Sequence, residues 1–495
     1  MSKNVIVIGA GIAGLSAGVY AQKCGFNVTI LESHNIPGGI CTSWKRKGYL
    51  FEGGMHWLAG SSEKQHMNKM WRHIGALNDS VKISYSEPFV EYNHNGTPIR
   101  LYRNVDTTER HFLELSPDDA KEIKKFCNNL RKLKIVSRPI NDIKGVKVTK
   151  KNPRKLSDLF ILFPMIRIMT AYSKVSVLQY GQRFKHEGIR QMFNSMPGSE
   201  QGIVMLMFTM SALARGDGGF PEGGSIPFVE RIANTFTSLG GKILYNTPAE
   251  KVIVENNKAV GVMAKGERMS ADAVIITSDT MAIDRFFDTL PKASWLDKMR
   301  KITEPTSATF ISLGINADLS HYPERPLINL KKPIEISGIA NESLLLSNYA
   351  TDPHYSPEGK SVITTQLHGD TYDYWKKLKD ESVEKYKEEK KRVSDEVIAE
   401  ISAFMPEADG KIEVCDVATP LTYERYCGNW KGSWMTAITP NTKFKPYPSA
   451  IKGLDGVYFA GQRMIPPGGM PPAMISARTA VQYLCRDTNT LFVSE

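Results

Sequence analysis

Three features of the first 32 residues predict an α/β fold. Residues 5–8 are a short β-branched run that can be buried on both faces, as in a strand of a parallel sheet. A glycine turn follows at once, with the GxGxxG spacing of Gly9, Gly11 and Gly14. Residues 15–23 have a helical composition, and a second apolar strand, residues 27–31, ends at Glu32. Strand, turn, helix and strand in this order predict a Rossmann-like unit.

Each part of this unit has a physical role. Gly9 permits the tight turn, Gly11 lets the backbone approach a pyrophosphate, and Gly14 lets the helix pack closely on the strand. The phosphates then meet the positive end of the helix. Glu32, eighteen residues after Gly14, suits a carboxylate that binds a ribose 2′-hydroxyl, and it would repel a 2′-phosphate. We therefore predict a dinucleotide site that contains Gly9, Ala10, Gly11, Ala13, Gly14, Glu32 and Ser33.

Two further glycine-rich segments distinguish FAD from NAD, which the turn alone does not. Residues 37–44 read Pro-Gly-Gly-Ile-Cys-Thr-Ser-Trp, and residues 48–57 read Gly-Tyr-Leu-Phe-Glu-Gly-Gly-Met-His-Trp. They resemble the flavin amine oxidase and phytoene desaturase superfamily, in which a GG doublet and a GY-x-F-(D/E)-x-G segment continue the FAD site. The resemblance is closest to carotenoid isomerases, retinol saturases and bacterial phytoene-dehydrogenase-like proteins. It implies FAD as the cofactor and adds Gly38, Gly39, Ile40, Gly54, Met55, His56 and Trp57 to the predicted site.

The resemblance extends over nearly the whole chain, through residues 218–225 and 240–275 to the C-terminal region. In the family, the backbone at the Val252 position contacts the adenosine part of FAD. Residues 456–462 predict a strand that ends in a turn, and residues 466–474 open a helix. The resemblance implies that this helix begins beneath the flavin ring, where its N-terminus would stabilise negative charge on a reduced flavin. These segments contribute Val252, Gly461, Gln462, Gly469, Met470, Pro471 and Met474.

The predicted architecture is a glutathione-reductase-like, Rossmann-like FAD-binding domain with a discontinuous α+β substrate domain. The segments expected in the FAD-binding domain are residues 1–75, 225–300 and 435–495, and those expected in the substrate domain are residues 76–224 and 301–434. Residues 361–367 predict a strand that walls the substrate cavity, and residues 376–404 predict a long, charged, solvent-exposed helix. A second strand–GxGxxG–helix unit is missing from the sequence. Electrons must therefore be exchanged with an unidentified donor or acceptor, or no net transfer occurs.

The formal net charge of +11 comes from one stretch of the chain. Residues 121–155 hold thirteen basic and two acidic side chains, and residues 156–172 follow with a dense apolar pattern. Basic residues beside an apolar helix suit an anionic membrane surface, so the region 121–185 is predicted to face a membrane. A core helix behind a solvated basic loop is an equal alternative. Nucleic acid is not expected, because interleaved aromatic residues and a reader fold are missing.

Cysteine usage and hydropathy bound the location of the protein. The six cysteines are scattered and form no CxxC pair, which indicates a reduced compartment, and no bound metal is expected. The sequence has neither a signal peptide nor the roughly 20 uninterrupted apolar residues of a membrane span. We expect a cytoplasmic protein or one held peripherally at a membrane.

The chemistry implied by the resemblance is desaturation, saturation or cis–trans isomerisation of a polyene, retinoid or other lipophilic substrate, carried by the flavin. His56 is the predicted catalytic residue, because an imidazole near the flavin can transfer a proton. The alternative for His56 is a hydrogen bond to flavin or backbone. Aromatic side chains could line a polyene channel or pack in the core, namely Trp57, Tyr423, Tyr426, Trp430 and Trp434.

Two other functions stay open on the sequence. The first is an amine-oxidase-like enzyme. However, Ile40 stands where many amine oxidases carry an arginine, and Gln462 stands where an acidic residue is common in the family. The second is a non-catalytic flavoprotein that binds lipids and keeps FAD as a structural part.

Overall fold

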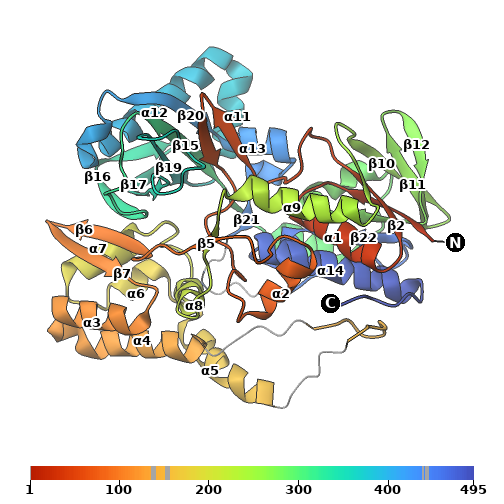
Figure 1. The fold of residues 1–495 in the computed structure, drawn as a ribbon, viewed down its shortest axis with the longest axis horizontal. Helices are drawn as coiled ribbons and strands as arrows, with labels where there is room; N and C mark the ends of the chain where they lie inside the picture. The colour runs from red at the N-terminus through yellow and green to blue at the C-terminus, as the bar shows by residue number, and fades with distance from the viewer. Residues whose placement is uncertain (1, 135–140, 151–156, 438–439, 441–444, 495) are drawn as a thin grey trace.

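The computed structural model describes residues 2–134, 141–150, 157–437, 440 and 445–494, and the side chains of residues 157–162 are left out of the description. Its centre is a five-stranded parallel sheet in the order β22-β13-β1-β2-β9 (Figure 1). The strands are β1 (Asn4–Ile8), β2 (Asn27–Leu31), β9 (Lys242–Leu244), β13 (Ala273–Ile276) and β22 (Val457–Phe459). The predicted α/β class is confirmed, and the sheet gathers strands from three distant parts of the chain.

Alternation along β1 sends its side chains to two different layers. Val5 and Val7 pack against a helical layer, and Ile6 and Ile8 pack on the opposite face. The helical layer consists of α1 (Ile12–Lys23), α2 (His66–His73), α9 (Ser225–Ser238) and α14 (Met470–Asp487). The opposite face is covered by an antiparallel sheet of β10 (Ala249–Glu255), β11 (Lys258–Ala264) and β12 (Glu267–Ser270).

Two four-stranded sheets form the other half of the molecule (Figure 1). The first has the order β18-β19-β15-β20, with β15 (Ala308–Ile315), β18 (Ser347–Asn348), β19 (Ser361–His368) and β20 (Ile412–Ala418). The second has the order β17-β16-β6-β7, with β6 (Val90–His94), β7 (Thr97–Leu101), β16 (Pro326–Ile336) and β17 (Ile339–Leu345). β19 confirms the strand predicted at residues 361–367.

The single charged helix predicted at residues 376–404 is wrong in one respect. The segment forms two helices, α11 (Tyr372–Glu381) and α12 (Val383–Phe404), separated by Ser382. Ser382 has extended backbone, and its Oγ accepts a hydrogen bond from the Lys385 amide at 3.2 Å, so it caps the start of α12. α12 also buries one face, which includes Val393, Val397 and Ile401.

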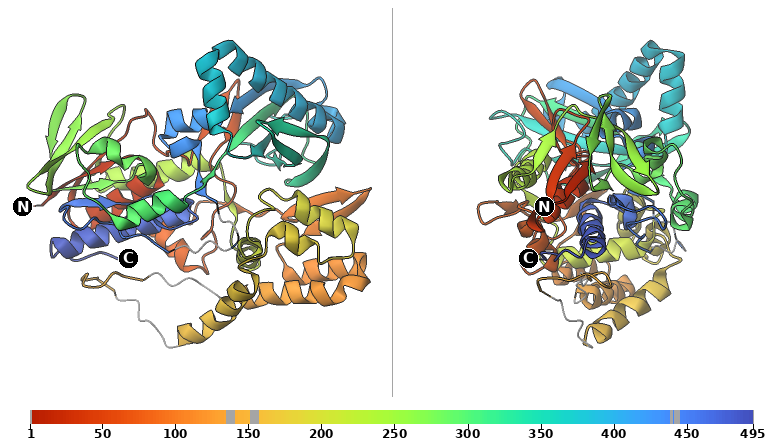
Figure 2. Two further views of the ribbon diagram at one scale, coloured as in Figure 1. Left: turned by 180° about the vertical axis from the view of Figure 1, so that it is seen from behind. Right: turned by 90° about the vertical axis from the view of Figure 1, so that its right-hand side faces the viewer.

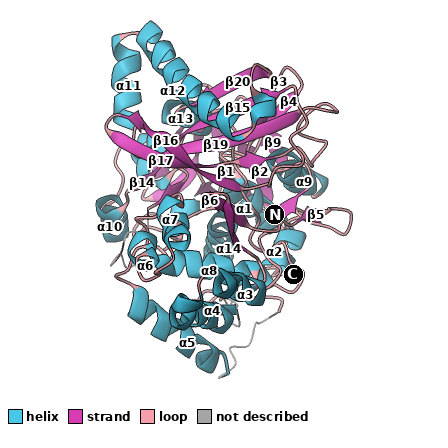
Figure 3. Ribbon diagram, turned by 90° about the vertical axis from the view of Figure 1, so that its left-hand side faces the viewer, coloured by secondary structure: helices cyan, strands magenta, loops and turns pink. Residues whose placement is uncertain are grey.

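Helices form a separate layer beneath these sheets (Figures 2 and 3). They are α3 (Val105–Leu115), α4 (Ala120–Lys134), α5 (Ser157–Tyr172), α6 (Val177–Gly181), α7 (Glu187–Ser195) and α8 (Ile203–Leu213). The first part of the basic stretch is therefore the helix α4 rather than a loop. Arg138, Lys151, Arg154, Lys155 and Leu156 lie outside the described residues.

The remaining elements are short. They are β3 (Ser43–Arg46), β4 (Tyr49–Glu52), β5 (Ile83–Ser84), β8 (Phe220–Pro221), α10 (Ser294–Ile302), β14 (Pro305–Thr306), α13 (Pro420–Cys427) and β21 (Met435–Thr436). Among the described residues, no helix has the length and hydropathy needed to cross a membrane.

Candidate functional site

The glycine turn lies at the C-terminal end of β1, between strand and helix. A Cβ at Gly14 would lie 1.8 Å from the carbonyl oxygen of Gly9, so α1 packs on β1 at a distance that only glycine permits. Gly11 caps the start of α1, and a Cβ there would meet its nearest atom at 3.7 Å. The GG doublet lies against this turn, because the Gly38 amide donates to the Ala10 carbonyl at 2.9 Å.

Glu32 lies at the same turn and is buried. Its carboxylate accepts hydrogen bonds from the Ala10 amide at 2.6 Å and the His34 amide at 2.8 Å. Its carbonyl accepts from the Thr247 amide at 2.7 Å, which ties the segment before β10 to the turn. Ser33 is exposed, and Val252 is buried in β10. The residues predicted at the adenosine end thus lie on neighbouring segments.

The GG doublet and the segment around Gly54 are packed on each other. A Cβ at Gly54 would lie 2.3 Å from the Ile40 carbonyl oxygen. Next to them, the buried Glu52 carboxylate accepts from the amides of Gly54 and Met55, each at 2.9 Å. It also accepts from the amide of Ser225 at 2.9 Å and from its hydroxyl at 2.5 Å, at the start of α9. Glu52 therefore fixes the backbone that leads to His56.

The C-terminal turn faces the same region. Gly461 donates its amide to Ser476 Oγ at 2.9 Å, and Gln462 Oε1 accepts from the Gly469 amide at 3.3 Å. Gly469 has φ of +99° and caps α14, and a Cβ there would meet nothing within 4 Å. Met470 begins the helix, and Cys41 Sγ lies 3.6 Å from its Sδ. The turn is thereby joined to the GG segment, with Pro471 half-buried and Met474 fully buried just beyond.

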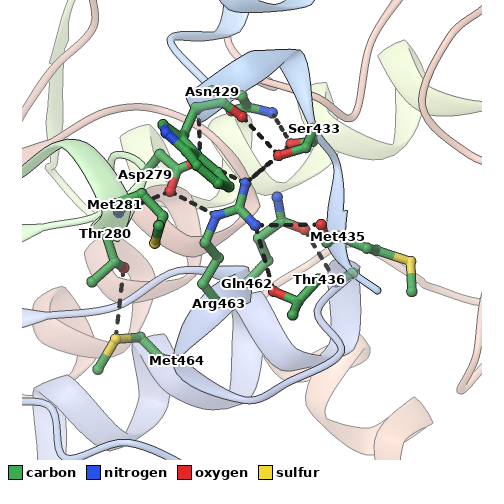
Figure 4. Close-up of polar contacts among 12 residues, drawn as sticks. Asp279, Thr280, Met281, Asn429, Ser433, Met435, Thr436, Gln462, Arg463 and Met464 are labelled. Atoms are coloured by element: carbon green, nitrogen blue, oxygen red, sulfur yellow. Dashed lines mark hydrogen bonds and ion pairs between the residues drawn. The ribbon is translucent and has the colours of Figure 1, made fainter. Parts of the chain in front are cut away.

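A buried ion pair joins this turn to the segment that follows β13 (Figure 4). Arg463 Nε donates to Asp279 Oδ1 at 2.7 Å, and both side chains are almost fully buried. The guanidinium also donates to Ser433 Oγ at 2.5 Å and lies over the Trp430 ring, 5.6 Å from its centroid. Asp279 accepts from the Trp430 amide at 2.9 Å as well.

His56 faces β19 rather than the backbone. Gln366 Nε2 donates to His56 Nε2 at 2.8 Å, and His368 lies two residues further along the strand. Burial lowers the pKa of His56 to about 3, with smaller contributions from Arg325 and His368, and burial lowers the pKa of His368 to about 4. Both imidazoles are therefore neutral near pH 7, and His56 holds no imidazolium proton to donate.

The aromatic candidates are placed differently from one another. The guanidinium of Arg325 lies over the ring of Trp57, and Trp57 also lines a cavity of about 190 Å³ together with residues of α8. Trp434 contacts Phe310 and lies 6.1 Å from the ring of His368. Tyr423 packs in the core, which is one of the two alternatives that the sequence left open. Tyr426 is 48% exposed and is therefore not a core residue.

Sequence reasoning missed the partners of His56 and of the C-terminal turn. Gln366 and His368 share one face of β19, and their polar character in an apolar strand was a usable signal. Arg325 and Asp279 carried no such signal, because they meet the site only through tertiary packing.

The comparison with protein families decides the assignment. The flavin containing amine oxidoreductase family matches residues 12–485, almost the whole chain. The chain belongs to this family. It is therefore a flavoprotein enzyme with FAD as cofactor. The glycines fit such a group, because added Cβ atoms at Gly11 and Gly461 would meet nothing closer than 3.7 Å and the one at Gly469 would meet nothing within 4 Å.

Curated relatives match most of the length of this chain at low identity. A phytoene desaturase (lycopene-forming) of a Paracoccus species is 24% identical, with 98% of each chain covered. Prolycopene isomerase 1 of an Oncidium hybrid cultivar is 24% identical, over 94% of this chain and 81% of the relative. An all-trans-retinol 13,14-reductase of Danio rerio is 22% identical, over 87% of this chain and 76% of the relative.

A solved structure supports the fold. The crystal structure of an oxidoreductase from Methanosarcina mazei is similar to this chain with a TM-score of 0.61 and 17% identity, covering 97% of this chain and 100% of that one. The predicted fold class is confirmed by this likeness and by the parallel sheet.

Proposed function

We propose that this enzyme acts on carbon–carbon bonds of a lipophilic unsaturated substrate, such as a carotenoid, retinoid or other polyene, by desaturation, saturation or isomerisation. This proposal rests on one observation, the apolar and uncharged character of the side chains that wall the site at His56. Trp57 and Trp434 are aromatic, and His56 and His368 are kept neutral by burial. Such walls suit an apolar chain that needs orientation more than acid–base chemistry.

The residues that would hold FAD in this proposal are those predicted from the sequence, from the Gly9 turn and Glu32 to the start of α14. The cofactor domain would comprise residues 1–75, 225–300 and 435–495, and the substrate domain the rest. Bound FAD supplies hydride transfer. The neutral His56, held by Gln366, orients groups at the site and excludes water, so we assign it positioning rather than proton donation.

Amine oxidation is the less favoured function. An aliphatic amine is an ammonium cation at neutral pH, and the half-buried Arg325 guanidinium, whose charge acts on His56, would repel it. Ile40 and Gln462 also depart from the residues common in amine oxidases.

Anaerobic turnover tests the proposal. The holoenzyme, oxidised or reduced with dithionite, is incubated with phytoene, prolycopene or all-trans-retinol, and products are separated by chromatography. Conversion of one polyene in one redox state is the expected result. Hydrogen peroxide release from aliphatic amines without polyene conversion would instead establish amine oxidation. A flavin spectrum that no polyene changes, with no conversion, would leave a lipid-binding flavoprotein.

We also propose that α5 places the protein peripherally on a membrane, from which a lipophilic substrate can enter. One face of this helix packs on the core through Ile168 and Tyr172. Its other face carries Phe163, Ile166 and Met169, which are 67%, 55% and 44% exposed. An apolar face beside the basic α4 has the composition of an interfacial helix.

Liposome flotation tests this placement. Exchanging the three exposed apolar residues for serine should reduce binding to anionic vesicles at least about tenfold, since each buried CH₂ contributes about 0.8 kcal/mol. The matched control exchanges three exposed apolar residues of the FAD-binding half, Leu239, Leu244 and Val254, and should bind as the parent does. Equal flotation of both variants would contradict the proposal.

A further inference from the structure

Arg325 is an unusual residue in the half of the molecule that holds β16. It directly precedes β16, and burial lowers the pKa of its guanidinium. Arg325 Nε is buried and has no hydrogen-bond partner. Within the described part of the chain, no side-chain hydrogen bond or ion pair of Arg325 is found. A guanidinium stays charged in proteins, so the charge is not removed by deprotonation.

The neighbours of this guanidinium are aromatic rings. It lies 5.6 Å from the centroid of Trp57 and 5.2 Å from that of Phe89. Cation–π contacts offset part of the cost of burial, but they leave the donors of the guanidinium unused. Glu324 attracts Arg325 at longer range, but no ion pair joins the two, and the Glu324 carboxylate accepts from Thr351 Oγ1 at 3.3 Å. A buried cation without a hydrogen-bonded anion is costly unless a ligand provides one.

The position of Arg325 identifies this ligand. Its charge contributes to the low pKa of His56, so it lies within electrostatic reach of the residue expected beside the flavin. Arg325, His56, Gln366 and His368 all keep accessible area, although burial dominates the pKa of the three titratable ones. Trp57, over whose ring Arg325 lies, lines the cavity of about 190 Å³ beside α8, so the guanidinium lies next to an internal space. The anion must therefore enter with the molecule that fills this space.

We propose that Arg325 binds a terminal carboxylate of the substrate, so that the enzyme acts on a polyene acid rather than on a pure hydrocarbon. A planar carboxylate matches the fork of a guanidinium and can take two parallel hydrogen bonds. The rings of Trp57 and Phe89 would cover the adjoining carbons. This inference rests on the proposed function, because it assumes a lipophilic chain in the cavity.

The test compares a polyene acid with its neutral ester. cis-Parinaric acid and its methyl ester are titrated into the holoenzyme, and the rise in tetraene fluorescence gives each dissociation constant. The acid should bind at least about tenfold more tightly than the ester, as expected for hydrogen bonds to a charged group. Arg325→Met should abolish this preference and leave the ester unchanged, and Arg325→Lys should keep part of it.

A matched control uses a second arginine that lies over aromatic rings. Arg183 stacks on Tyr180 and Tyr172 in the separate layer formed by α3 to α8 and pairs with Glu122. Arg183→Met should keep the full preference for the acid. Equal binding of acid and ester to the parent would overturn the carboxylate site and leave the proposed function standing. If neither the acid nor the ester binds, both the carboxylate site and the proposed function are overturned. A preference unchanged in Arg325→Met, with a shifted flavin midpoint potential, would assign Arg325 to the flavin instead and overturn the inference.

Discussion

Gly11 and Gly14 lie three residues apart in one turn, but the structure predicts opposite consequences when each becomes alanine. At Gly14 the new Cβ would lie 1.8 Å from the Gly9 carbonyl oxygen, inside β1's own turn. At Gly11 the nearest atom would be 3.7 Å away, an ordinary contact. Gly14→Ala should therefore damage the fold, and Gly11→Ala should damage only cofactor binding.

The magnitudes follow from these distances. The Gly14→Ala Cβ must move by at least about 1.2 Å to reach even a 3.0 Å contact, and α1, which is buried along most of its length, must move with it. Overpacking in a well-packed core costs about 1–3 kcal/mol, and we expect the upper end of this range or more. Gly11 has φ of −72°, which alanine adopts freely, so Gly11→Ala should cost about 1 kcal/mol or less as a poorer helix cap.

The assay separates folding from cofactor binding. Urea unfolding of the flavin-free proteins gives the stability change, and quenching of FAD fluorescence gives the dissociation constant. Gly11→Ala should weaken FAD at least about tenfold, because its methyl group fills the space through which the backbone meets the pyrophosphate. Gly202→Ala is the matched control, since Gly202 also caps a helix with negative φ and open space at its Cβ.

Two results would refute this reasoning. Gly11→Ala that binds FAD within twofold of the parent would show that the pyrophosphate does not approach this turn. Gly14→Ala as stable as Gly202→Ala would show that β1 and α1 tolerate a wider separation than the structure has.

Three further predictions concern buried charges and hydrogen bonds. Arg463→Met should lower the free energy of unfolding by about 3–5 kcal/mol because it leaves the buried Asp279 carboxylate without its partner. Adding Asp279→Asn to the same chain should restore part of this loss. A double variant whose loss of stability equals the sum of the losses of the two single variants would contradict this coupling. Glu52→Ala should lower the urea midpoint because it leaves buried amide and hydroxyl donors without an acceptor. Each donor left without an acceptor costs about 1–3 kcal/mol of stability. An unchanged midpoint would mean that water replaces the carboxylate. Below pH 6.5 the unfolded chain protonates His56 and His368, whereas the folded chain, with pKa values of about 3 and about 4, does not. The free energy of unfolding should therefore fall with decreasing pH by up to about 1.4 kcal/mol per pH unit for each histidine. Replacing both histidines with glutamine should flatten this profile, and an equally steep profile would show that neither histidine is buried in its neutral form.

The sequence predicted best where the structure is local. The strand, turn and helix at residues 4–23 involve contacts a few residues apart, so the spacing of Gly9, Gly11 and Gly14 was sufficient. The break at Ser382 was missed although it is also local. Lysine and glutamate favour helix on both sides of it, and a single serine cap is a weak signal within such a pattern.

Contacts between distant segments could not be predicted in the same way. Gln366 meets His56 across 310 positions of sequence, and Asp279 meets Arg463 across 184. These pairs depend on how β19 and β13 are positioned, which no local pattern determines. The sequence located the segment that carries His56, and the structure supplied the group that occupies its Nε2.

The two ends of the expected FAD site differ in how the chain builds them, and this difference explains what can be inferred about the substrate. The phosphate end uses backbone groups and glycine, whose requirements are geometric and visible in the sequence. The flavin end uses side chains whose charge depends on burial: His56 and His368 become neutral, whereas the pKa of Arg325 starts too high for burial to discharge it. Neutral imidazoles near one guanidinium that has no hydrogen-bonded anion would suit a ligand that is apolar along its length and anionic at one end, as proposed above. With the role proposed for Arg325, the choice of substrate would depend on this residue more than on the residues that hold FAD.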